Sequence, residues 1–268
     1  MRNPSDLRPT DPLHGLHMKG TVTRRFLVTY PVPPEALAFA VPPGGELVLH
    51  NGLAWVSACF VHLAGMRPSW LPEILGMDFN YLIHRTLARL PYPDGQRRST
   101  VLVLEANINR PLLGVIARKT TGVRFRIREI TLETLDQSWI VRMKEGPDVL
   151  YEAEIDKRSI GLQIDARSRF ASASEADRFL LGISFGAQWE PEARQIKLLA
   201  ETHDPWQTYV GRCRTSRHAL LTSLGVTQFD ADHVITMTDI PHYFALRGLA
   251  VACPAPSSLA NSVPEPGR

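Results

Sequence analysis

The sequence has few cysteines and no long apolar run. Its three cysteines are far apart and odd in number, and no Cys-x-x-Cys pair occurs, so neither a disulfide framework nor a thiolate zinc site is expected. No apolar stretch approaches the roughly 20 residues of a membrane span, and the N-terminus lacks the apolar segment of a signal peptide. We therefore expect a soluble, cytoplasmic protein with reduced thiols.

The sequence also has no large excess of charge of either sign. The net charge is +3 over 268 residues. A charge this small gives little reason to expect a nucleic-acid or membrane partner, and we predict neither. Arg124, Arg126 and Arg128 alternate along one segment. In a nearly neutral chain, a solvated strand face is favoured over phosphate binding for such a row.

Several motifs that carry enzyme chemistry are absent. The sequence contains no GxSxG, Walker or GxGxxG pattern and no HxH or HExxH pair, so we predict no metal and no cofactor. The apolar share of 44% is enough for one large core, and no linker divides the chain. We predict a single β-rich domain over residues 21–252, with poorly ordered tails at residues 1–20 and 253–268.

The most informative stretch runs from Val101 to Leu132. Residues 101–108 alternate in polarity, which predicts a strand. Pro111 suits the first turn of a helix and Gly122 its end, and the two-residue period returns after Gly122. The stretch is therefore predicted to be strand, short helix, strand, and only a larger β-rich body could bury that helix's apolar side.

Other segments predict further strands and a few short helices. Asn51-Gly52 indicates a hairpin turn between strands at 47–50 and 53–62. Residues 79–90 fit a strand with Tyr81 and Arg85 on one face, but they also fit a helical period, and periodicity leaves both alternatives open. Ser174-Glu175-Ala176-Asp177 resembles a capping box before a helix at about 175–182.

Taken together, the order of several short segments resembles the YqjF-like family of uncharacterised proteins, which is related to acetoacetate decarboxylases. The resemblance covers roughly residues 21–251. It implies an α+β, β-rich fold: an antiparallel, largely closed β-barrel-like body with a few short flanking helices and an interior ligand cavity. The segments are Val32-Pro33-Pro34-Glu35-Ala36-Leu37, Gly52-Leu53-Ala54-Trp55-Val56-Ser57, Arg67-Pro68, Leu71-Pro72, Phe79, Arg85-Thr86, Ala117-Arg118, Gly122-Val123 and His203-Asp204-Pro205-Trp206.

The sequence departs from the decarboxylases at their reactive lysine. In that family a lysine follows a Gly-x-Pro run after the short helix and forms a Schiff base with the keto acid. Here the run is Gly122-Val123-Arg124, and the next residue is Phe125. A phenyl ring supplies no nucleophile, and the nearest lysine, Lys119, is predicted on the last helical turn. We therefore do not expect Schiff-base chemistry.

The candidate site residues each have a structural alternative. Arg118 could grip a carboxylate, or it could simply complement a helix end. Arg85 on an apolar face needs an anionic partner, either Glu105 within the protein or a ligand. His203 could act as a catalyst or form a corner hydrogen bond. The predicted ligand contacts are Arg85, Tyr81, Glu105, Arg118, Trp55 and Phe125, and the catalytic candidates are Glu105, Arg118 and His203.

Three functions remain open from the sequence. The preferred one is binding of a small anionic or carbonyl-bearing organic molecule in an interior cavity, without a Schiff-base lysine. The second is a lyase- or hydrolase-type enzyme that uses Glu105 or His203 with Arg85 or Arg118. The third is a non-catalytic interaction module whose cavity is filled by side chains. Association into a homo-oligomer through exposed strand edges also stays open.

Overall fold

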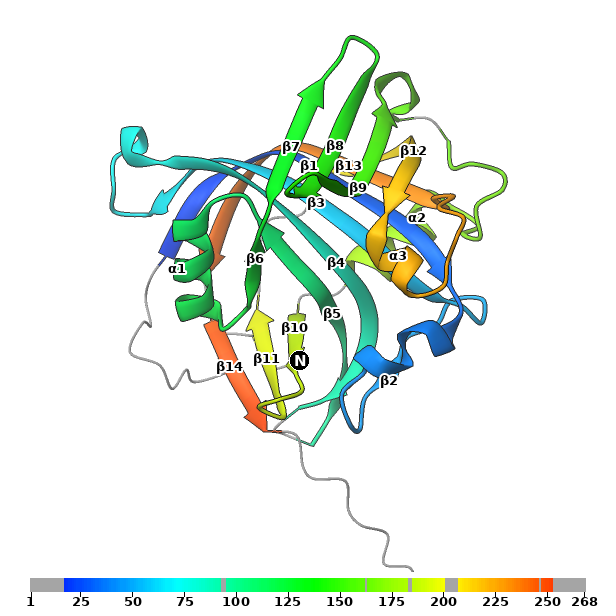
Figure 1. Cartoon of the computed structure of the whole chain (residues 1–268), viewed down its shortest axis with the longest axis horizontal. Helices are drawn as coiled ribbons and strands as arrows, with labels where there is room; N and C mark the ends of the chain where they lie inside the picture. The colour runs from blue at the N-terminus through cyan, green and yellow to red at the C-terminus, as the bar shows by residue number, and fades with distance from the viewer. Residues whose placement is uncertain are drawn as a thin grey trace, which may run out of the picture.

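Antiparallel strands dominate the computed structural model, which describes residues 17–92, 95–161, 163–182, 185–200, 207–245 and 247–252 (Figure 1). Among these residues, no helix is both long and apolar enough to cross a bilayer. The strands are β1 (His17–Val32), β2 (Glu46–Leu47), β3 (Ala54–Pro68), β4 (Met77–Pro91), β5 (Arg97–Ile108), β6 (Phe125–Ile127), β7 (Glu129–Thr134), β8 (Ser138–Glu145), β9 (Asp148–Asp156), β10 (Phe185–Glu190), β11 (Gln195–Ala200), β12 (Tyr209–His218), β13 (His233–Ala245) and β14 (Arg247–Ala252). The helices are α1 (Pro111–Thr121), α2 (Ala173–Leu181) and α3 (Ala219–Ser223), with 3-10 turns η2 (Pro34–Ala40), η3 (Glu73–Leu75) and η4 (Lys157–Ser159).

One highly curved sheet contains all of these strands. Its order is β14-β11-β10-β5-β4-β3-β1-β13-β12-β9-β8-β7, with β2 added on β4 and β6 on β5. The two ends of this path do not pair within the described residues. Instead, β7 returns to β4 through side chains, because Asn80 Nδ2 and Asn109 Nδ2 donate to the Ile130 carbonyl at 2.9 and 3.4 Å. The β-rich class is thus confirmed, whereas the sheet is not closed by backbone ladders as a barrel would be.

The central strands β1, β3 and β4 bury both of their faces. Side chains alternate along a strand, so one stretch of sequence supplies two cores. One face, here called the β8–β9 face, is covered by β7, β8, β9 and α3 and includes Phe26, Tyr30, Val56, Phe60 and Leu82. The other, here called the α2 face, is covered by α1, α2 and the segment around Phe170 and includes Leu27, Trp55, Cys59, Leu63 and Leu180.

A β-bulge in β5 decides which face its polar residues occupy. His84 of β4 pairs with Glu105, but the next residue, Arg85, pairs with Val103. One extra residue in β5 therefore moves Glu105 to the face of His84 and leaves Val103 on the face of Arg85. The uninterrupted alternation expected for residues 101–108 is wrong at this point.

The Asn51-Gly52 turn signal is present but acts differently from the expectation. Asn51 and Gly52 both have positive φ, and His50 and Leu53 exchange backbone hydrogen bonds, as in a tight hairpin turn. The hairpin ends there, because β2 pairs with β4 instead of β3.

Residues 77–91 form a strand, which resolves the strand-or-helix alternative in favour of the strand.

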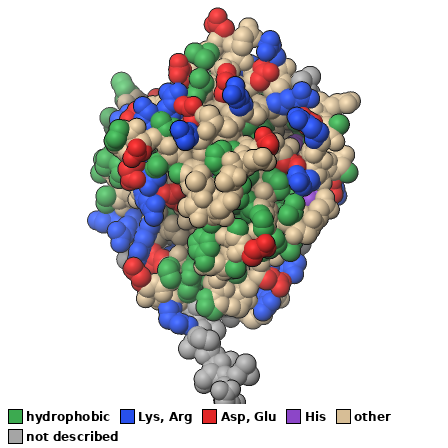
Figure 2. Space-filling model, turned by 45° about the vertical axis from the view of Figure 1, so that its right-hand side comes forward, with side chains coloured by type: hydrophobic (Ala, Val, Ile, Leu, Met, Phe, Trp, Pro, Cys, Tyr) green, Lys and Arg blue, Asp and Glu red, His purple; other side chains and the backbone are tan. Residues whose placement is uncertain are grey.

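The outer surface carries no field of a single sign on the side that Figure 2 presents. Basic and acidic side chains are interspersed there, with apolar side chains between them. Such mixing agrees with the small net charge of the chain.

Candidate functional site

A row of buried polar residues crosses the α2 face. Arg85 pairs with Ser57 across β4 and β3, Ser57 with Thr29 across β3 and β1, and Thr29 with His233 across β1 and β13. All four side chains are buried, and the Thr29 and Ser57 hydroxyls are 3.2 Å apart. Four polar groups placed side by side in an apolar core are costly unless each has hydrogen-bond partners.

Helix α2 and a group of aromatic rings cover this row. Arg85 Nη2 donates to the Leu180 carbonyl at the end of α2, at 3.0 Å. The Trp55 and Phe170 ring centroids are 4.6 Å apart, and Phe170 lies 5.8 Å from the His233 ring. Burial lowers the pKa of His233 below its usual value, so its ring is neutral at pH 7. The row thus combines one fixed cation with neutral hydrogen-bonding groups.

Four of the six predicted ligand contacts belong to this face. Trp55 is in its core, Tyr81 and Phe125 pack against that core, and Arg85 lies in the polar row. Glu105 lies on the opposite face, so the expected Arg85–Glu105 pair does not form. Arg118 is exposed on the last turn of α1. His203 lies outside the described residues.

Glu105 is the centre of a second polar cluster, on the β8–β9 face. Its Oε2 lies 3.3 Å from His84 Nδ1, and its Oε1 lies 2.8 Å from Arg126 Nη1 and 3.4 Å from Arg128 Nη1. Arg128 is almost fully buried, so part of the predicted arginine face is not solvated. Burial by itself would raise the pKa of Glu105, but the His84 ring and the two guanidinium groups more than offset it and lower the pKa to about 2.

His84 leads from this carboxylate into the interior of the β8–β9 face. The His84 and His218 ring centroids are 4.9 Å apart, and the Tyr30 and Tyr151 rings meet His218 edge-on. Burial, with repulsion from His84 whenever that ring is protonated, lowers the pKa of His218 to about 2. Its Nδ1 accepts the Leu221 N–H, so the proton of this neutral ring is on Nε2. Neither His84 Nε2 nor His218 Nε2 has a hydrogen-bond partner among the described residues, and the 3.3 Å contact of His84 Nδ1 with Glu105 lacks hydrogen-bond geometry.

Most residues of this second cluster were not predicted from the sequence as site residues. His84 could have been found, because it alternates with Arg85 on a predicted strand and so had to occupy the other apolar face. His218 had no such signal, since its approach to His84 depends on how β12 and α3 fold over β4. The Tyr30 hydroxyl meets Thr215 Oγ1 at 2.6 Å, a contact between the first strand and a distant one.

An amine that was also missed lies next to α1. Gly122 ends this helix with a φ of 74°, and a Cβ added there would lie 3.2 Å from Cδ of Lys197. The stem of Lys197 therefore packs over the helix end, and its Nζ donates to Gln195 Oε1 at 3.1 Å. Lys119, by contrast, is exposed on the last turn of α1.

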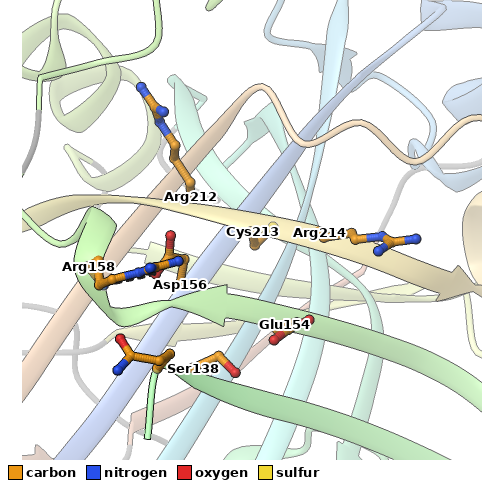
Figure 3. Close-up of a pocket in the computed structure, with 8 residues that line it drawn as sticks. Ser138, Glu154, Asp156, Arg158, Arg212, Cys213 and Arg214 are labelled. Atoms are coloured by element: carbon orange, nitrogen blue, oxygen red, sulfur yellow. Dashed lines mark hydrogen bonds and ion pairs between the residues drawn. The ribbon is translucent and has the colours of Figure 1, made fainter. Parts of the chain in front are cut away.

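A shallow hollow on the outer side of β8, β9 and β12 is lined by several arginines (Figure 3). Arg158 lies against Asp156, while Arg212 and Arg214 point away from each other. These guanidinium groups do not converge on one point, so the hollow lacks the geometry of an anion site.

Solved structures place this fold among acetoacetate decarboxylase-like proteins. Acetoacetate decarboxylase from Legionella pneumophila has a TM-score of 0.61 at 13% identity, with 92% of this chain and 93% of that chain covered. An acetoacetate decarboxylase-like enzyme from Sphingomonas wittichii RW1 has a TM-score of 0.59 at 11% identity, covering 89% and 94%. The enduracididine biosynthesis enzyme MppR, complexed with pyruvate, has a TM-score of 0.56 at 14% identity, covering 87% and 89%.

The family follows from the sequence itself. The chain belongs to the DUF2071 family of uncharacterized conserved proteins, whose model matches residues 20–241. A comparison with curated proteins gives no match. The resemblance inferred from the short sequence segments is thereby confirmed.

Proposed function

We propose that the protein binds a small anionic or carbonyl-bearing organic molecule at the polar row of the α2 face. The row of Arg85, Ser57, Thr29 and His233 is the observation that carries this proposal. A guanidinium group can hold a carboxylate through two parallel hydrogen bonds, and neighbouring hydroxyls can donate to a carbonyl oxygen. Trp55, Tyr81 and Phe125 would supply the apolar walls.

The fold relatives support a ligand of this class. MppR is solved with pyruvate and with the condensation product of pyruvate and imidazole 4-carboxaldehyde, so this fold can hold a small keto acid. In the proposed site the keto acid is bound and not linked covalently, because Phe125 stands where the resemblance puts the decarboxylase lysine. The shape of the site selects among ligands of this class.

Calorimetric titration with pyruvate and acetoacetate tests the proposal, with acetone and acetate as partial probes. We expect saturable binding of the keto acids that weakens about tenfold or more in Arg85→Gln, since a charged hydrogen-bonded pair is lost. Ser57→Ala should weaken the keto acids more than acetate, because only the keto acids offer a second carbonyl. Arg118→Gln is a matched control on an exposed arginine, and it should bind as wild type does. No binding of any probe by wild type would favour an interior filled by side chains.

Borohydride trapping separates simple binding from amine chemistry. Incubation with pyruvate and sodium borohydride should leave Lys119 and Lys197 unmodified in peptide mass maps. A reduced adduct on either lysine would show that a Schiff base forms, and the non-covalent proposal would then be wrong.

A second candidate function is supported by the carboxylate–imidazole pair of Glu105 and His84. A carboxylate at Nδ1 keeps the proton of a neutral imidazole on that nitrogen and leaves Nε2 to accept a proton from a substrate. This would make the protein a lyase- or hydrolase-type enzyme, with His84 as base and Glu105 as its positioning partner. A substrate screen of wild type against His84→Gln tests it: turnover of any substrate that His84→Gln retains in full would exclude His84 as the base.

A further inference from the structure

A separate hollow of about 420 Å³ opens where β7 and β8 face β1 and β4. Arg24, His62 and Asn80 form a cross-strand row along one side, on β1, β3 and β4. Leu132, Thr134 and Trp139 line the other side, from β7 and β8. The hollow lies on the β8–β9 side of the sheet, whereas the polar row of the proposed function lies on the α2 face.

The neighbours of His62 fix the nitrogen on which its ring carries a proton. Asn80 Nδ2 donates to the Ile130 carbonyl at 2.9 Å, and only the amide nitrogen can do so. The Asn80 oxygen is therefore the atom that meets His62 Nδ1, at 2.6 Å. An amide oxygen only accepts, so Nδ1 carries a proton. The neutral His62 ring then has Nε2 as a hydrogen-bond acceptor on a side chain that lines the hollow.

Arg24 supplies a cation beside this acceptor. Its guanidinium lies 5.4 Å from the centroid of the Trp139 ring, and its Nη1 donates to the Thr23 carbonyl at 2.6 Å. These contacts hold the group at the edge of the hollow. Asp239, 3.7 Å away, is largely exposed, so it is a weak competitor for a bound anion.

We propose that this hollow binds a small 2-hydroxy carboxylate. The carboxylate pairs with Arg24, the neighbouring hydroxyl donates to His62 Nε2, and the Trp139 ring packs against the ligand's carbon atoms. Asn80 is a positioning residue, because it sets the tautomer of His62 without touching the ligand. Among the described residues that line the hollow, His62 carries the only imidazole and Arg24 the only guanidinium.

Lactate, propionate and lactamide separate the three contacts in NMR titrations of the full chain. Lactate should bind about tenfold more tightly than propionate, which lacks the hydroxyl, and lactamide, which lacks the charge, should bind most weakly. Arg24→Gln should weaken lactate and propionate alike by about tenfold or more. His62→Phe and Asn80→Leu should remove the preference for lactate and leave propionate nearly unchanged.

A control variant and chemical protection of His62 complete the test. Arg158→Gln removes an arginine on another surface and should bind lactate as wild type does. Shift changes at residues that line the hollow are scored apart from those on the α2 face, so failure here is distinguishable from failure of the proposed function. In wild type, lactate should also protect His62 more than His50 from diethyl pyrocarbonate. Equal affinity for lactate and propionate, full binding by Arg24→Gln, or absence of this protection would overturn the proposal.

Discussion

Individual ionisable groups in the core of this protein are held in one protonation state by their neighbours. Glu105 is kept as an anion by the adjacent imidazole and arginines, although burial opposes its charge. His218 is kept neutral because burial opposes its charge. Both residues therefore bind a proton more readily in the unfolded chain than in the folded one. Linkage then requires that the folded state lose stability in acid.

Replacement of Glu105 by glutamine tests how much this buried carboxylate stabilises the fold. The pKa of Glu105 is about 2 in the folded protein, against 4.5 unperturbed. Its stabilising effect is thus complete above pH 4.5 and is lost as the pH falls towards 2. We expect Glu105→Gln to lower the free energy of unfolding by about 1–3 kcal/mol at pH 7 and to flatten the loss of stability between these two pH values.

Urea unfolding at a series of pH values measures this effect. Glu145→Gln is the matched control, since that exposed carboxylate also pairs with Arg128. An exposed pair contributes little, so this variant should stay within about 0.5 kcal/mol of wild type. If the free energy of unfolding of Glu105→Gln falls below pH 4.5 as steeply as that of wild type, Glu105 is not the group responsible.

The second residue-scale prediction concerns His218→Asn. The pKa of His218 is about 2 in the folded protein, against an ordinary 6.5, so its contribution to stability is present above 6.5 and falls steadily at lower pH. Asparagine can still accept the Leu221 N–H, but it does not titrate. We expect the variant to lose stability at pH 7, because it leaves a cavity, yet to show a shallower decline from pH 6.5 to 4.

Leu221→Ala supplies the comparison for His218→Asn. It opens a cavity in the same core without removing a titrating group. Urea midpoints for this variant should fall by a similar amount at every pH. Parallel pH profiles for the two variants would show that His218 is not the group responsible.

The faces that individual side chains occupy were predicted correctly at some positions and wrongly at others. Tyr81 and Arg85 were correctly placed on one face, because strict alternation holds along this part of β4. Glu105 was placed on the wrong side, because the bulge at its position leaves no mark in the polarity pattern. One inserted residue reverses every assignment beyond it.

Among the elements, α2 shows how a local signal can be shifted by a few residues. The expected capping box began at Ser174, whereas the structure has Ser172 at the N-cap. Ser172 Oγ accepts the Glu175 N–H at 3.1 Å, and Glu175 Oε2 accepts the Ala171 N–H at 2.6 Å. Ser172 precedes the helix, whereas Ser174 is its second residue. Only Ser172 has a glutamate three residues later, as the capping-box pattern requires, so the correct cap was present in the sequence and was assigned two residues too late.

This cap gives a prediction at the scale of the element. Ser172→Ala should destabilise the protein by about 1 kcal/mol, since it leaves a backbone donor at the start of α2 without its acceptor. Ser174→Ala, two residues further on, is the control and should change stability by less than about 0.5 kcal/mol. Thermal unfolding of the two variants measures the difference, and an equal effect at both positions would refute the assignment.

At the scale of the whole molecule, the two cores share one set of strands. Leu82 belongs to the β8–β9 core and Leu63 to the α2 core, yet both lie on adjacent central strands. Neither core can therefore be lost while the other keeps its backbone. This sharing is why the β-rich class could be predicted from the apolar strand β3, whereas the open path of the sheet could not.

Unfolding should consequently be a single cooperative event. Leu82→Ala and Leu63→Ala should each lower the free energy of unfolding by about 2–5 kcal/mol. In both variants, tryptophan fluorescence and far-UV circular dichroism should report coincident transitions. Separate transitions in either variant would mean that the two cores unfold independently.

The pairing of β1 has a consequence for how the protein is made. β1 is hydrogen-bonded on one edge to β3 and on the other to β13, whose residues come near the opposite end of the described chain. While the nascent polypeptide is still on the ribosome, that second edge lacks its complete native partner until residue 245 has emerged. During this interval β1 presents an open edge to other nascent chains, and holding by a chaperone is of most benefit until synthesis is nearly finished.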